Sequence, residues 1–91
     1  MNHTFDEESL SPEEEEQIAI QDDLEMLRED LIGELQAINQ YQEHIESLGS
    51  EEAITTLEHI IEDEKEHVAE LTKVIQNLDP IQAEKFKKQT L

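Results

Sequence analysis

Glu34, Glu64 and His67 are the residues of this 91-residue chain whose types and spacing indicate chemistry. Apolar residues recur at steps of three and four along two segments, and each pattern is interrupted once, by Glu34 in the first and by Glu64 in the second. A carboxylate at such a position points toward the apolar face of its helix. His67 follows Glu64 by three residues, which places the imidazole on the same face one turn along.

The heights of the two glutamates match if the segments form an antiparallel hairpin that turns at residue 49. Residues at equal height then have numbers that add to about 98, as those of Glu34 and Glu64 do, and both lie about 22 Å from the turn. Two neighbouring buried carboxylates cost several kcal/mol, as an order of magnitude, unless they are protonated or bound to a cation. A third of the chain is charged, so either glutamate alone could occupy its position by accident and reach outward to water. The matched pair favours a cation site.

Two long helices are needed to position these residues. The first is predicted from about residue 21 to Gly49, which can end a helix, and the second from Ser50, which can cap the next one. Asp79-Pro80 ends the second helix and can begin a short third one. We therefore expect an all-α fold with three parts: an acidic, disordered tail over 1–20, a helical hairpin over 21–78 and a short C-terminal helix over 79–91.

One hairpin cannot cover its own apolar face, so we expect two hairpins to pair into a four-helix bundle. Two-fold symmetry would gather Glu34, Glu64 and His67 from both chains, giving four carboxylates and two imidazoles. That is the ligand set of di-iron carboxylate bundles. Oxygen and nitrogen ligands suit two iron ions at each dimer interface, while manganese, zinc or calcium could substitute. His44 and His59 lie off the apolar patterns and are expected to face solvent.

Charge and composition exclude several classes of partner. Six basic and 25 acidic residues give a net charge of −19, which disfavours nucleic acid and anionic membrane surfaces. The chain contains no cysteine, so neither disulfides nor thiolate ligands can stabilise it. No apolar run approaches the roughly 20 residues of a membrane span, and the N-terminus does not follow the signal-peptide pattern. These features predict a soluble, cytoplasmic protein.

The stretch ELQAINQYQEHIESLGSEEAITTLEHIIEDEKEHVAELTKVIQNLDP, residues 34–80, resembles the encapsulated ferritins. Its helix spacing and its Asn-Leu-Asp-Pro exit are most similar to the archaeal type, which is fused to a shell protein. The resemblance implies that Glu34, Glu64 and His67 are ferroxidase ligands and that Tyr41 is a neighbour of the site. It also implies that the four-helix bundle is ferritin-like, and that the bundles form a ring-shaped decamer inside an encapsulin shell. Two features depart from the family: Gly33 and Gln36 replace carboxylates of an outer metal-attracting site, and residues 87–91 do not look like a shell-binding peptide.

The resulting hypothesis is a ferroxidase that oxidises Fe(II) to Fe(III) and supplies iron storage inside an encapsulin nanocompartment. One alternative is a metal-stabilised structural or cargo module without turnover. Another is an acidic helical interaction protein that binds no metal, in which case the matched heights of Glu34 and Glu64 are coincidental.

Overall fold

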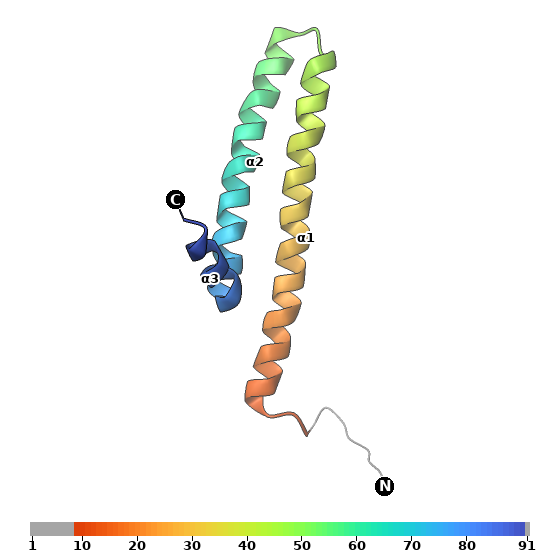
Figure 1. The fold of residues 1–91 in the computed structure, drawn as a ribbon. Helices are drawn as coiled ribbons and strands as arrows, with labels where there is room; N and C mark the ends of the chain where they lie inside the picture. The colour runs from red at the N-terminus through yellow and green to blue at the C-terminus, as the bar shows by residue number, and fades with distance from the viewer. Residues whose placement is uncertain (1–8, 91) are drawn as a thin grey trace.

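The computed structural model describes residues 9–90, which form a helical hairpin with a short third helix (Figure 1). Helix α1 spans Pro12–Ser47, α2 spans Glu51–Leu78 and α3 spans Pro80–Lys88. No strand occurs among the described residues, so the predicted all-α hairpin is confirmed. Helices α1 and α2 run side by side in opposite directions, and α3 folds back beside the end of α2. The described part of the chain is elongated, with extents of 70 × 35 × 15 Å.

The start of α1 differs from the predicted disordered tail over residues 1–20. Ser11 and Glu14 form a reciprocal capping box, in which each side chain accepts a hydrogen bond from the other residue's backbone N–H. Pro12 is the first helical residue, where its missing N–H costs nothing, and acidic side chains favour the positive end of the helix dipole. These effects outweigh the repulsion within the four-glutamate run. The tail prediction is therefore wrong from Pro12 onward, while residues 1–8 lie outside the described part.

The turn between the long helices lies where it was predicted, but its capping differs in detail. Leu48, not Gly49, is the C-cap of α1, and its backbone N–H donates to the Ile45 carbonyl at 3.3 Å. Neither glycine has the positive φ that a left-handed glycine cap would require. Ser50 caps α2 as predicted, because its hydroxyl accepts a hydrogen bond from the Ala53 N–H at 3.1 Å.

Asp79 fixes the junction of α2 and α3. Its backbone ends α2, and its Oδ1 accepts a hydrogen bond from the Gln82 N–H at 3.1 Å, which caps α3. Its Oδ2 pairs with the Arg28 guanidinium at 3.1 Å, so the same carboxylate also ties the junction to α1. Pro80 cannot continue the hydrogen bonding of α2, and the chain therefore bends at this point.

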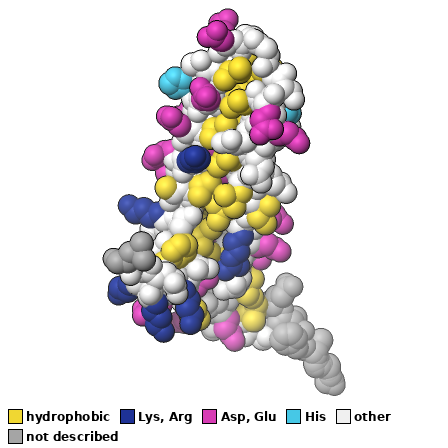
Figure 2. All heavy atoms as spheres, turned by 45° about the horizontal axis from the view of Figure 1, so that its top comes forward, with side chains coloured by type: hydrophobic (Ala, Val, Ile, Leu, Met, Phe, Trp, Pro, Cys, Tyr) yellow, Lys and Arg dark blue, Asp and Glu magenta, His cyan; other side chains and the backbone are white. Residues whose placement is uncertain are grey.

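The core within one chain is small. Among the described residues, only Leu24, Ile61 and Ile75 are buried apolar side chains. Most other apolar residues that face the neighbouring long helix are half-buried, and a continuous stripe of hydrophobic side chains runs along one face of the hairpin (Figure 2). A chain of this length with so little burial has a small margin of stability by itself. Within residues 9–90, no helix is both long and apolar enough to cross a membrane.

Candidate metal centre

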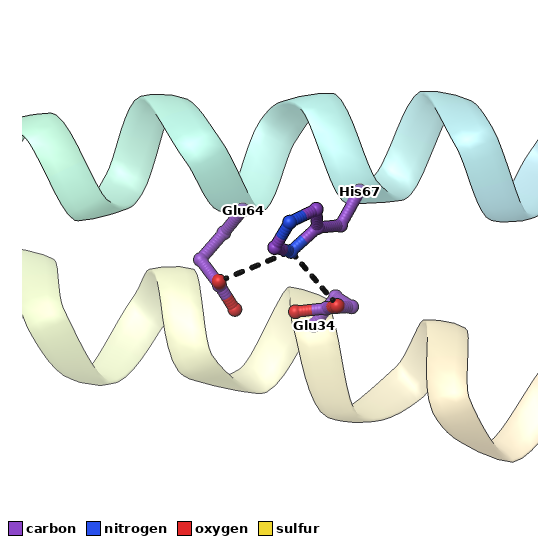
Figure 3. Close-up of side chains that lie close together, drawn as sticks. All are labelled: Glu34, Glu64 and His67. Atoms are coloured by element: carbon purple, nitrogen blue, oxygen red, sulfur yellow. Dashed lines mark ion pairs between the residues drawn. The ribbon is translucent and has the colours of Figure 1, made fainter.

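The structure brings Glu34, Glu64 and His67 together in the middle of the hairpin. Glu34 projects from α1, while Glu64 and His67 project from successive turns of α2 (Figure 3). His67 Nδ1 lies 3.2 Å from Glu34 Oε2 and 3.3 Å from Glu64 Oε1. One ligating atom from each residue falls within 4.8 Å of the other two, as three ligands of one metal ion require. The juxtaposition predicted from the matched heights is confirmed.

The three side chains are only partly shielded from solvent. Their exposed fractions are 24% for Glu34, 17% for Glu64 and 46% for His67. The carboxylates therefore lose much of their hydration, while the imidazole remains accessible from outside the hairpin. A cluster with this exposure is not sealed by its own chain, and an ion or a second protein chain can approach it directly.

The closeness of the two carboxylates changes the acidity of Glu34. A hydrogen bond with the side chain of Glu64 raises the pKa of Glu34 above its ordinary value, and partial desolvation and the negative charge of Glu64 act in the same direction. The nearby imidazole of His67 opposes this rise. Glu34 thus holds a proton more readily than an isolated glutamate does. A metal ion at this place would substitute for that proton.

Four other residues that the sequence analysis named, either near the site or facing solvent, lie outside the cluster. Tyr41, two helical turns from Glu34, is half-buried on α1 and is not part of the three-residue group. His44 and His59 are both exposed, in agreement with their positions off the apolar patterns. Gly33 has open space where a Cβ would stand, so close approach of a helix within the chain does not explain a glycine there.

A groove beside the cluster contains three carboxylates that sequence reasoning missed. Glu29, Asp30 and Glu70 line it together with Glu34 and His67, and its other lining residues are Gly33, Leu71 and Val74. The sequence contained the signal, because Asp30 precedes Glu34 by four residues and Glu70 follows His67 by three, so each lies one turn from a cluster member. These acids make the approach to the cluster strongly negative, which attracts cations.

The donor set determines which chemistry the cluster can perform. Two carboxylates and one imidazole suit iron, manganese or zinc, and the chain has no thiolate that would select a structural zinc site. Three protein donors leave coordination positions open, and open positions are typical of sites that bind and transform a ligand. The cluster can therefore bind a divalent cation but cannot enclose it within one chain.

Comparison with known proteins gives one curated relative. The chain is 40% identical over 57 residues to the "Encapsulin nanocompartment cargo protein EncC" of Myxococcus xanthus (strain DK1622). The match covers 63% of this chain but only 44% of the relative, so the chain spans less than half the length of that protein. No protein-family model and no solved structure matches the chain.

Proposed function

We propose that this protein is a ferroxidase that acts as cargo of an encapsulin nanocompartment. The observation that carries the proposal is the cluster of Glu34, Glu64 and His67, whose ligating atoms lie within 4.8 Å of one another on two facing helices. The similarity to a protein named as an encapsulin cargo supports the setting inside a shell. The resemblance to the archaeal, shell-fused type stays a prediction.

A complete site needs two copies of the chain. A single hairpin offers three donors on a partly open face, and its apolar stripe is left without a cover in the same chain. Pairing two hairpins across this stripe would bury the half-exposed apolar residues and bring two clusters together in a four-helix bundle. The paired site would hold four carboxylates, whose charge balances two ferrous ions. The decameric ring implied by the family resemblance would repeat this unit.

The substrate of the proposed reaction is ferrous iron. Glu34 and Glu64 would bind two ferrous ions at each interface, and His67 would complete the ligand set, as carboxylate and imidazole donors favour. Each Fe(II) loses one electron, and the two electrons together with two protons reduce one dioxygen to hydrogen peroxide. Carboxylate oxygens stabilise Fe(III) more than Fe(II), since they are hard anionic donors, and so make the oxidation more favourable. Tyr41, on the same helix as Glu34, is proposed as a neighbour of the site and not as a ligand.

Oxygen consumption after anaerobic loading with ferrous iron tests the proposed activity. We expect Glu34→Ala, Glu64→Ala and His67→Ala each to slow oxidation about tenfold or more, because each removes a ligand. His59→Ala is the matched control, since His59 is an exposed histidine on the same helix. Equal rates for all four variants, with helical content unchanged by circular dichroism, would refute the ligand assignment.

The competing function is a metal-stabilised cargo module without turnover. The name of the relative describes a cargo protein and no catalytic activity, so it agrees with this function as well as with a ferroxidase. It predicts that the protein binds iron or zinc and assembles but does not consume oxygen faster than ferrous iron alone in the same buffer. The metal content of protein purified without chelator separates both functions from a module that binds no metal.

A further inference from the structure

His67 has two ring nitrogens, and one of them faces the two carboxylates of the cluster. Its Nδ1 lies 3.2 Å from Glu34 Oε2 and 3.3 Å from Glu64 Oε1. Carboxylate oxygens are acceptors, so at these distances Nδ1 carries a proton and donates it. Figure 3 shows the other nitrogen, Nε2, turned away from Glu34 and from α1. Neither carboxylate of the cluster therefore holds Nε2.

An ion bound among these three residues would change what the imidazole requires. The ion takes the place of the Nδ1 proton, and the neutral imidazole then keeps its one hydrogen on Nε2. Histidines that bind metals almost always donate this second N–H to a carboxylate, a carbonyl or a water, which fixes the ring and makes the nitrogen at the metal more basic. His67 is 46% exposed, so its ring has room to turn by half a rotation and present a carbon in place of Nδ1. An acceptor for the Nε2 hydrogen opposes that turn.

The direction of the imidazole indicates which residue can provide this acceptor. Side chains on a helix lean toward the preceding turn, and Figure 3 shows the His67 ring extending from α2 toward Glu64 on that turn. Asp63 stands on the same turn, four residues before His67, and residues at this spacing are neighbours on a helix surface. The side chain of Asp63 is exposed and forms no hydrogen bond or ion pair with another described residue. Its carboxylate can therefore rotate toward Nε2 without breaking another contact.

Two other carboxylates near His67 fit less well. Asp30 and Glu70 line the groove beside the cluster together with His67. Glu70 stands on the following turn of α2, opposite to the direction in which the ring extends. Asp30 belongs to α1, and Nε2 is turned away from that helix. Glu70 is therefore a control for the effect of a nearby negative charge alone.

We propose that Asp63 is a positioning residue of the metal centre, whose carboxylate accepts a hydrogen bond from His67 Nε2–H and so holds Nδ1 toward Glu34 and Glu64. The inference rests on the proposed function, because it requires an ion at the cluster. Asp63 contacts neither the ion nor dioxygen. It acts through His67, by keeping the ring in one orientation and one tautomer and by raising the affinity of Nδ1 for the ion.

Zinc binding to the full chain tests the proposal apart from oxidation. Zinc accepts the same carboxylate and imidazole donors and is diamagnetic, so calorimetry and NMR can use one sample. We expect Asp63→Ala to weaken zinc binding about tenfold, because the imidazole loses its acceptor. Asp63→Asn keeps an amide oxygen that can accept the hydrogen bond, and Glu70→Ala removes only an exposed charge. Each of these two variants should weaken binding by less than about threefold.

The imidazole gives a readout that the loss of a charge elsewhere would not change. In zinc-loaded protein with isotope-labelled histidine, the Nε2–H of His67 should give an NMR signal that is protected from exchange with water. We expect this signal in the parent, in Asp63→Asn and in Glu70→Ala, and we expect Asp63→Ala to lose it. The variant His67→Ala identifies the signal, and circular dichroism checks that helical content is equal.

The possible results separate this proposal from the proposed function. Zinc binding by Asp63→Ala as tight as that of the parent, or equal losses in Asp63→Ala and Glu70→Ala, would overturn the role of Asp63 and leave the metal centre standing. A zinc-loaded parent without a protected Nε2–H would overturn it in the same way. A parent that bound neither zinc nor ferrous iron would refute the metal centre, and the role of Asp63 with it.

Discussion

Glu34 and His67 meet at 3.2 Å across the hairpin, Oε2 to Nδ1, although they come from different helices. The contact is made at mid-length of the hairpin, where apolar packing would be expected on both sides. Glu64 reaches the same imidazole nitrogen at 3.3 Å, so His67 lies between two carboxylates. A cation placed among these atoms would find one ligating atom of each residue within 4.8 Å of the other two.

Metal binding and assembly should be coupled. Without metal, two copies that meet at the cluster bring four carboxylates together, and their repulsion opposes association until cations arrive. Ferrous iron added without oxygen should shift the mass distribution toward dimers and larger rings. Glu64→Gln removes repulsion together with a ligand charge, and it should associate with less dependence on metal. Light scattering that gave one unchanged mass with and without iron would contradict this coupling.

Glu34 should stabilise the metal-free chain less as pH rises. The raised pKa of Glu34 means that the folded state binds its proton more tightly than the unfolded state does. The stabilisation is complete below the unfolded-state pKa and is lost as pH increases through the higher folded-state value. Urea unfolding in chelator at several pH values measures this trend. Glu34→Gln should make the free energy of unfolding depend less on pH between the unfolded-state and folded-state pKa of Glu34. If the free energy of unfolding of the variant fell as steeply with pH as that of the parent, the effect would belong to other groups.

The small core should make single truncations costly. Leu24 is 1% exposed, so Leu24→Ala should lower the free energy of unfolding by about 2–5 kcal/mol. Met26→Ala, two residues along the same helix at a site that is 56% exposed, should change it by less than about 0.5 kcal/mol. Chemical denaturation in chelator compares the two variants. If both variants lost a similar amount of free energy of unfolding, the face of α1 that carries Met26 would also be packed against protein in solution.

Oxidation and storage of iron should be separable. In the proposed assembly, each four-helix bundle is formed by two hairpins that pair across a metal site. Little helix surface then remains for contacts that would close the assembly into a hollow shell around the iron. Given many ferrous ions per site in air, the isolated protein should turn over and then lose iron to precipitate. Co-assembly with an encapsulin shell should keep the iron soluble. Size-exclusion chromatography, with iron and protein followed together, measures how much iron stays with the isolated protein. Retention of the iron by the isolated, soluble protein would contradict the separation of oxidation from storage.

The sequence predicted the hairpin and the cluster because both depend on local rules. Ser50 and Asp79 cap helices at the predicted positions, and the turn position alone set Glu34 and Glu64 at one height. The start of α1 was misplaced because a run of glutamates resembles a solvated tail. The capping box that begins with Ser11 was the stronger local signal.

Two other features could not be obtained from spacing along the chain. The Arg28–Asp79 pair joins residues 51 positions apart and depends on the bend before Pro80, which no periodicity encodes. The extension of α1 beyond the last residue of α2 depends on the difference in length between the two helices, so it became apparent only when the true start of α1 was known. Tyr41 remains a predicted neighbour of the site, because its position on the α1 pattern is equally consistent with packing.

Anomalous diffraction at the iron edge tests the central claim most directly. Crystals grown in chelator and soaked anaerobically in ferrous iron should show two peaks at an interface between copies, each within ligand distance of Glu34, Glu64 or His67 side chains from both chains. Crystals of Glu64→Ala should lack these peaks. Strong peaks only at the exposed acids, or at a cluster contributed by a single chain, would contradict a shared di-iron site.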